Sequence, residues 1–275
     1  MRNVCLPFFS IPGSSHQASG ARLECGLTLT SFALTTQPAM SPAHACRETR
    51  DKVFQAHQAY HGRVEDRTSA RRDQAFLAFA ATFFVLHQFP SVLLSDRMEA
   101  AVDVLTPFAV AASTVAVMLA LGASRGPILA AVLAGVLYVH GHGVHLAANS
   151  IHNEGVGGDV VYFWDERFSH IEAVLGWFGL VAAFCLAERM SPRSASTSPA
   201  LLGLAALLLG WTFFTSTVEG QTWWLELPAT ALFGVWALRA RRPLLGAAAA
   251  AFALGALLIA AWAIWHGGVP EFSDL

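Results

Sequence analysis

The stretch from Tyr138 to His170 reads YVHGHGVHLAANSIHNEGVGGDVVYFWDERFSH, and it joins one apolar run to the next. Its polar side chains include His140, His142, His145, Asn149, His152, Glu154, Asp159, Asp165, Glu166 and His170. Several of them fall where a lipid-embedded helix is expected, and ionisable groups at membrane depth are costly without a partner or a task. We therefore interpret this stretch as the main part of a polar, metal-binding site at one end of a membrane helix bundle.

The composition indicates an integral membrane protein. Of 275 residues, 55% are hydrophobic and 13% are charged, whereas a soluble domain has about 45–50% apolar and about 25% charged residues. The net charge of −2 gives no indication of a nucleic-acid partner. The four cysteines, Cys5, Cys25, Cys46 and Cys185, form no CxxC pair, so neither a disulfide framework nor a thiolate zinc site is predicted.

Residues 1–73 differ from the rest of the chain. The first 45 are mixed Ser, Thr, Pro, Gly and Ala, and residues 47–74 are densely charged and could form a polar helix. Arg22 precedes a mildly apolar run, and Ala43-His44-Ala45 resembles a signal-peptide cleavage site, but the apolar core is weak and far from Met1. We expect a largely disordered cytoplasmic extension, with Met40 as an alternative start and residues 1–39 left open as native sequence.

From residue 74 to 275 the pattern predicts an all-α, polytopic seven-transmembrane helix bundle. A spanning helix needs about 20 apolar residues. The expected spans are residues 74–95, 101–122, 127–150, 168–188, 199–218, 222–238 and 244–265. Arginines concentrate before the first span and in every second loop, and cytoplasmic loops are enriched in Lys and Arg. This predicts a multi-pass cell-membrane protein with a cytoplasmic N-terminus and an extracytoplasmic C-terminus.

On this topology the polar groups converge near the extracytoplasmic face. One stripe follows steps of four, three, four and three residues, which share a helix face: Tyr138, His142, His145, Asn149 and His152. Asp165, Ser169 and Glu172 share a face of the next span, and His170 lies off that face, so Asp165 and His170 are not both expected at one centre.

Imidazole is the commonest metal ligand, and three histidines with an open position are typical of a catalytic zinc. The candidate ligands are His145, His152, His170 and His266, with His142 as a further ligand and His87 in reserve. Asp165, Glu172 and Glu219 are the candidate groups for proton transfer. The set predicts a metal-dependent membrane hydrolase, with zinc as the metal. For His87 and His140 an ordinary interfacial role is equally consistent with their positions.

The layout resembles the superfamily that joins alkaline ceramidases with progestin and adipoQ receptors, often called CREST. The residues that carry the resemblance are Ser150 and His152 at the end of one span, Asp165 near the next, and His266 in the last. The chain has Ser150-Ile151-His152 where the family has Ser-x-x-x-His, and a single His266 where it has HxxxH. The resemblance implies zinc held by histidines, Ser150 as a catalytic group, and hydrolysis of a lipid amide.

Three other functions remain open at this stage. Histidines on different helices can ligate haem or a di-metal centre, so iron or haem is an alternative cofactor in a redox protein. Polar groups inside membranes also carry metal ions or protons in transporters. A receptor or assembly component would use the cluster structurally. Membrane lipids and a lipid-like or small-molecule substrate are the expected partners, and the sequence leaves the oligomeric state open.

Overall fold

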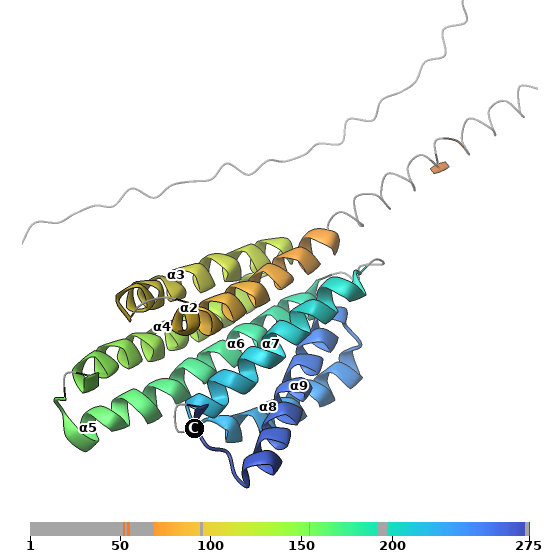
Figure 1. The fold of residues 1–275 in the computed structure, drawn as a ribbon. Coiled ribbons are helices and arrows are strands. Elements are labelled where there is room, and N and C mark those ends of the chain that lie inside the picture. Colours follow the sequence, from red (N-terminus) through yellow and green to blue (C-terminus); the bar gives the residue numbers. More distant parts are fainter. Residues whose placement is uncertain are drawn as a thin grey trace, which may run out of the picture. The chain divides into compact units, whose positions relative to one another are not determined.

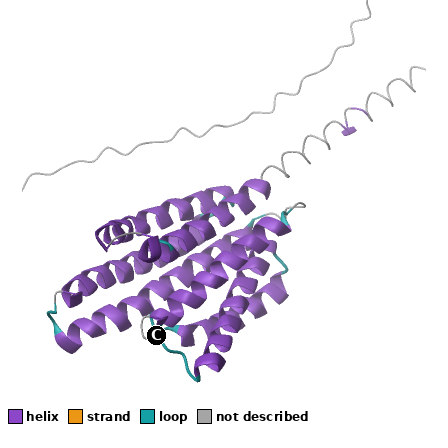
Figure 2. Ribbon diagram, in the orientation of Figure 1, coloured by secondary structure: helices purple, strands orange, loops and turns teal. Residues whose placement is uncertain are grey.

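The computed structural model describes residues 52, 54–55, 69–93, 96–153, 155–191, 197–272 and 275. The predicted disorder of the N-terminal extension and three of the four cysteines lie outside these residues. Within them every regular element is a helix and there is no strand (Figure 2). The all-α prediction is therefore confirmed for the described part of the chain.

The helices follow the predicted spans closely (Figure 1). Residues 69–88 are helical. They are followed by α2 (Pro90–Leu93), α3 (Asp96–Ala120), α4 (Arg125–Asn153), α5 (Gly158–Tyr162), the π-helix η1 (Phe163–Phe168), α6 (Ser169–Met190), α7 (Pro199–Glu219), α8 (Trp223–Ala240) and α9 (Pro243–His266). The first predicted span is interrupted at Phe89, because the residue before a proline disfavours the helical conformation.

Five of the described helical segments are long and apolar enough to cross a membrane. They are Ala101–Ala120, Arg125–Ile151, Gly158–Met190, Pro199–Glu219 and Pro243–His266. The count of seven spans is not confirmed. Helical residues 69–88 include three charged side chains among the first five that are described, and α8 carries Glu226 and Arg239 within only 18 residues.

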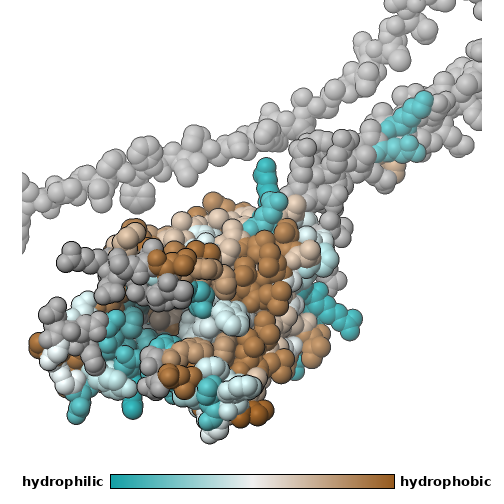
Figure 3. All heavy atoms as spheres, in the orientation of Figure 1, coloured by the Kyte–Doolittle hydropathy of each residue, from teal (hydrophilic) through white to brown (hydrophobic). Residues whose placement is uncertain are grey.

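Large apolar side chains cover the outer faces of these helices, which supports a membrane environment. Leu119 of α3, Leu238 of α8 and Ile264 of α9 are 77%, 79% and 85% exposed. Figure 3 shows hydrophobic side chains as a band between hydrophilic side chains at the left and right of the visible face. Soluble monomers rarely expose continuous apolar surface on this scale, so the chain is a membrane-embedded helical protein.

Helices α4 and α6 lie side by side along much of their length (Figure 1), and glycines allow their backbones to approach closely. A Cβ at Gly141 would come within 2.7 Å of the carbonyl oxygen of Ser169, and one at Gly176 within 2.8 Å of that of Ala134. Small residues allow this kind of contact between membrane helices. Of the two glycines flanking His142, Gly141 therefore serves helix packing, whereas nothing lies within 4 Å of a Cβ at Gly143.

Buried acidic side chains join the helix ends at the side of the bundle where α6 ends and α7 and α9 begin. Asp73 accepts a hydrogen bond from the backbone N–H of Ser198 (2.7 Å), just before α7. Glu188 near the end of α6 accepts from the backbone N–H groups of Leu244 (3.0 Å) and Leu245 (3.1 Å) in the first turn of α9. These carboxylates satisfy donors that a helix N-terminus leaves unpaired.

Candidate functional site

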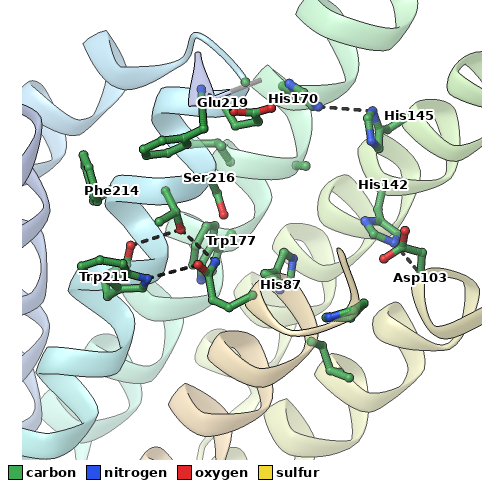
Figure 4. Close-up of a pocket in the computed structure, with 18 of the residues that line it drawn as sticks. His87, Asp103, His142, His145, His170, Trp177, Trp211, Phe214, Ser216 and Glu219 are labelled. Atoms are coloured by element: carbon green, nitrogen blue, oxygen red, sulfur yellow. Dashed lines mark hydrogen bonds between the residues drawn. The ribbon is translucent and has the colours of Figure 1, made fainter. Parts of the chain in front are cut away.

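A cavity of about 820 Å³ lies between the helix over residues 69–88 and α3, α4, α6, α7 and α9. Imidazoles of His87, His142, His145 and His170 line it together with the carboxyl groups of Asp103 and Glu219. Large aromatic side chains form the remaining walls: Tyr138, Trp177, Trp211, Phe214, Trp262 and Phe272. Figure 4 shows the histidines along α4 and α6 facing the tryptophans on α6 and α7. Apolar walls with a few convergent polar groups are typical of ligand sites.

The centre of the polar group is a contact between His145 of α4 and His170 of α6. Nδ1 of His145 and Nε2 of His170 are 3.2 Å apart and aligned as a hydrogen bond (Figure 4). Oδ1 of Asp165 lies 2.9 Å from the same Nδ1 atom. Asp165 is 1% exposed, and its Oδ1 has no aligned hydrogen-bond donor among the described residues. Nδ1 of His145 is therefore close to both the His170 imidazole and a buried carboxyl group.

The sequence interpretation placed Asp165 and His170 on different faces, and the structure corrects this. Asp165 lies in the π-helix η1 (Phe163–Phe168), which leads directly into α6. A π-helix has hydrogen bonds from residue i to i+5, so residues five apart come closer to alignment than on an α-helix. Asp165 and His170 are five apart, and both reach His145. Such π turns are frequent at functional sites.

The ring of His170 is held by the end of α7. A Cβ at Gly220, the residue after that helix, would lie 2.7 Å from Cγ of His170. Nδ1 of His170 is buried and has no aligned hydrogen-bond partner among the described residues. His170 thus offers one nitrogen to His145 and keeps a second one unpaired.

His87 and His142 have one nitrogen fixed by a backbone carbonyl. Nδ1 of His87 donates to the carbonyl oxygen of Phe83 (2.9 Å), and Nε2 of His142 donates to that of Asp103 (2.9 Å). Because a carbonyl oxygen only accepts, the other nitrogen of each neutral ring is an acceptor. For His87 this is Nε2, which lies 3.4 Å from the hydroxyl of Tyr138. The His87 ring is also stacked on Phe83, 5.0 Å away.

The remaining proton-transfer candidates have other partners. Glu172 lies 2.6 Å from Nδ1 of His140, and neither residue lines the histidine cavity. Ser150 donates to the carbonyl oxygen of Leu146 (2.7 Å) and is also outside the cavity. Glu219 lines the cavity, but its Oε2 accepts from the backbone N–H of Phe272 (2.8 Å). Glu219 therefore fixes the C-terminal segment, whose Phe272 forms one wall.

The predicted metal ligands come together only in part. His145, His170 and His142 line one cavity, whereas His266 does not and instead contacts Trp262, with ring centroids 4.1 Å apart. The side chain of His152 lies outside the described residues. Within the described part of the chain, no group of three or more His, Cys, Asp or Glu side chains is arranged to hold a metal ion.

Two cavity groups were missed as site residues from sequence. Asp103 near the start of α3 supplies both a carboxyl group and the carbonyl oxygen that fixes His142. Asp103 could have been found from its position, because it lies at the predicted extracytoplasmic start of the second span, at the same depth as the histidines. Gln88 links two residues of α7 by accepting from Trp211 (3.1 Å) and donating to Thr215 (2.8 Å) (Figure 4). Nothing in its spacing distinguished it from an interfacial residue.

The fold and the cavity define a membrane-embedded helical protein with a histidine-lined site. Comparison of the chain with family models, curated protein sequences and solved structures gave no match.

Proposed function

We propose that this chain is an integral membrane enzyme that hydrolyses a lipid-like molecule bound in the histidine cavity. The observation that carries the proposal is the pair formed by His145, which lines the cavity, and the buried Asp165, with Nδ1 and Oδ1 2.9 Å apart. An imidazole oriented by a carboxylate is a recurring general base. In this role a water molecule attacks an ester or amide carbonyl while His145 takes a proton from that water. His145 then returns the proton to the leaving group.

The form of the cavity supports a lipid-like substrate. Its volume of about 820 Å³ falls within the range of about 300–1,000 Å³ that is usual for ligand pockets. A few imidazole and carboxyl groups lie among large aromatic side chains in its lining. The surrounding helices include candidate membrane spans, so an apolar substrate reaches the cavity from the bilayer. The resemblance to the CREST superfamily points to the same class of substrate.

A metal-dependent form of this activity is favoured by one distance. Nδ1 of His145 and Nε2 of His170 lie 3.2 Å apart, close to the separation of about 3.3 Å between two ligands of a tetrahedral zinc with Zn–N bonds of about 2.0–2.1 Å. Oδ1 of Asp165, 2.9 Å from Nδ1 of His145, is a further metal-ligating atom beside these two nitrogens. The described residues supply no complete ligand group, so we derive no step through a metal. Zinc content is a separate measurement on the same protein.

The test is turnover by the full chain in lipid nanodiscs with a panel of acyl amides and acyl esters, followed by mass spectrometry. His145→Ala and Asp165→Asn are expected to lower kcat by about 10²–10⁴-fold, the usual contribution of general acid–base catalysis. His266→Ala is the matched control, because this imidazole lies outside the cavity lining. Wild-type turnover in His145→Ala would refute the proposal.

Metal analysis and an absorption spectrum of the same preparations separate the alternatives. Stoichiometric zinc that is lost in His145→Ala and His170→Ala supports the metal-dependent form. A haem spectrum supports the redox alternative instead. Ion flux into liposomes that His145→Ala abolishes, without any lipid turnover, supports a transporter.

A further inference from the structure

A second cavity of about 750 Å³ lies between α3 and α4 and reaches α6 at Leu180. We call it the apolar groove. Its walls extend from Pro107 on α3 to Gly122 in the turn after that helix, and on α4 from Ile128 to His140. Almost all the side chains that line it are aliphatic, and those deep in the groove include Val110, Met118 and Ala131. The groove therefore offers hydrocarbon contacts along its length.

The groove has the length of a lipid tail. The 12-residue step from Ile128 to His140 on α4 corresponds to about 18 Å at about 1.5 Å per residue. One leaflet of a bilayer has a hydrocarbon thickness of about 15 Å, half of the usual value of about 30 Å. The surrounding helices α3, α4 and α6 all contain candidate membrane spans. One extended acyl chain fits this space in length and chemistry.

The groove ends at the histidine cavity. Tyr138 lines both spaces and is 2% exposed, so its ring forms part of their common wall. Four residues further along α4, His142 belongs to the histidine cavity alone. On α3, Asp103 lies on the histidine side of the boundary and Pro107 on the groove side. The lining thus changes from polar to apolar over one turn on α3, and on α4 the groove ends at His140.

We propose that the apolar groove binds an acyl chain of the substrate, whose polar end lies in the histidine cavity. This inference rests on the proposed function and deepens it, because it assigns the substrate to long-chain acyl lipids. The spans Ala101–Ala120 in α3 and Arg125–Ile151 in α4 are the least buried of the five, with 28% and 22% of their most apolar stretches buried, against 56% for Gly158–Met190 and Pro199–Glu219. A space between two such loosely covered helices is directly accessible to lipid.

The test uses a phosphatidylcholine with a diazirine in one acyl chain, added to the full-length protein in nanodiscs and cross-linked by light. Adducts are expected on residues 110–118 and 131–136, enriched about tenfold over Leu232 and Leu238 on the outer surface of α8. Equal labelling of the groove and of α8 would overturn the inference. Weaker labelling of the groove than of α8 would overturn it as well, because the groove would then be filled by something other than lipid.

Two glycines on α4 provide a matched pair of variants. Gly135 lines the groove, and a Cβ there would lie 3.9 Å from Leu180, in ordinary contact. Gly135→Leu fills the groove and is expected to lower its labelling about tenfold. Gly143→Leu makes the same change on the same helix, outside both cavities and with nothing within 4 Å of the new Cβ, and is expected to label like the wild type. Equal labelling of the two variants would contradict the assignment.

A variant of Thr114 tests whether the occupant of the groove is a hydrocarbon. Thr114 lines the groove, and its buried hydroxyl has no hydrogen-bond partner among the described residues. A hydrocarbon chain cannot bond to it, so Thr114→Val is expected to leave labelling unchanged. A tenfold loss would instead assign a polar ligand. Labelling does not require turnover. Labelled protein without turnover refutes the proposed function alone, and turnover without groove labelling refutes this inference alone.

Discussion

Replacing Glu188 by glutamine is expected to destabilise the protein much more than the same replacement of Glu226. Both glutamates are buried, with exposures of 2% and 0%. The two oxygens of Glu188 accept hydrogen bonds from Leu244 and Leu245 at 3.0 and 3.1 Å. Pro243 opens α9 and has no N–H group, so these are the first backbone donors of that helix. Neither oxygen of Glu226 has a partner among the described residues.

The expected loss of stability follows from the acceptor that the glutamine amide group lacks. In Glu188→Gln one acceptor becomes an NH₂ group, so one buried N–H loses its partner at a cost of about 1–3 kcal/mol. Loss of the negative charge at the helix N-terminus adds about 0.3–1 kcal/mol. A total of about 1–4 kcal/mol corresponds to a Tm lower by roughly 3–16 °C for a domain of this size. In Glu226→Gln no hydrogen bond is lost, and the expected change in Tm is close to zero.

Differential scanning fluorimetry of both variants in one detergent measures the contrast. Glu226→Met provides a further check, because it replaces an unpartnered polar group by an apolar one of similar length and is expected to raise the free energy of unfolding by about 1–3 kcal/mol. Glu188→Met is expected to lower it by more than Glu188→Gln does. Equal Tm values for the two glutamine variants would show that Glu188 does not stabilise the start of α9.

Two glycine substitutions test the packing and the site separately. Gly176→Ala places a Cβ against the backbone of Tyr138 and should lower Tm by several degrees in scanning fluorimetry, whereas Gly143→Ala, with open space around its Cβ, should not. Gly220→Ala places a Cβ 2.7 Å from Cγ of His170, so this ring must move, and turnover in the lipid assay should fall about tenfold while Tm stays near the wild-type value. Unchanged turnover would mean that the position of the His170 ring is not critical.

Helix positions could be predicted well from sequence because apolar runs here end at strong breaking signals. The predicted span 199–218 corresponds to α7 (Pro199–Glu219), and 244–265 corresponds to α9 (Pro243–His266). In both cases a proline occupies the first turn, as is favoured at helix starts. The number of membrane crossings is harder to predict. The segment that forms α8 was predicted as a span, but it has only 18 residues and includes the ionisable side chain of Glu226.

The histidine site was predicted in part, and the differences have a local cause. The α-helical spacing on α4 correctly placed His142 and His145 on one side, where both line the cavity. The same rule failed for Asp165 and His170, because a π turn changes the angular step between residues. No pattern in FWDERF distinguishes a π turn from an α turn. His266 was assigned by depth alone, and depth does not fix the direction of a side chain around its helix.

Buried polar groups have hydrogen-bond partners at one end of the bundle and lack some of them at the histidine end. This difference argues for a ligand at the histidine end. Asp73 and Glu188 are fully engaged with the N-termini of α7 and α9, as a structural role requires. At the histidine end, Oδ1 of Asp165 and Nδ1 of His170 lack aligned partners among the described residues. An unsatisfied buried polar atom costs about 1–3 kcal/mol, and such atoms are rare in folded proteins. Of these two residues only His170 lines the cavity, so its unpaired Nδ1 is the buried polar atom whose cost a molecule bound there can relieve.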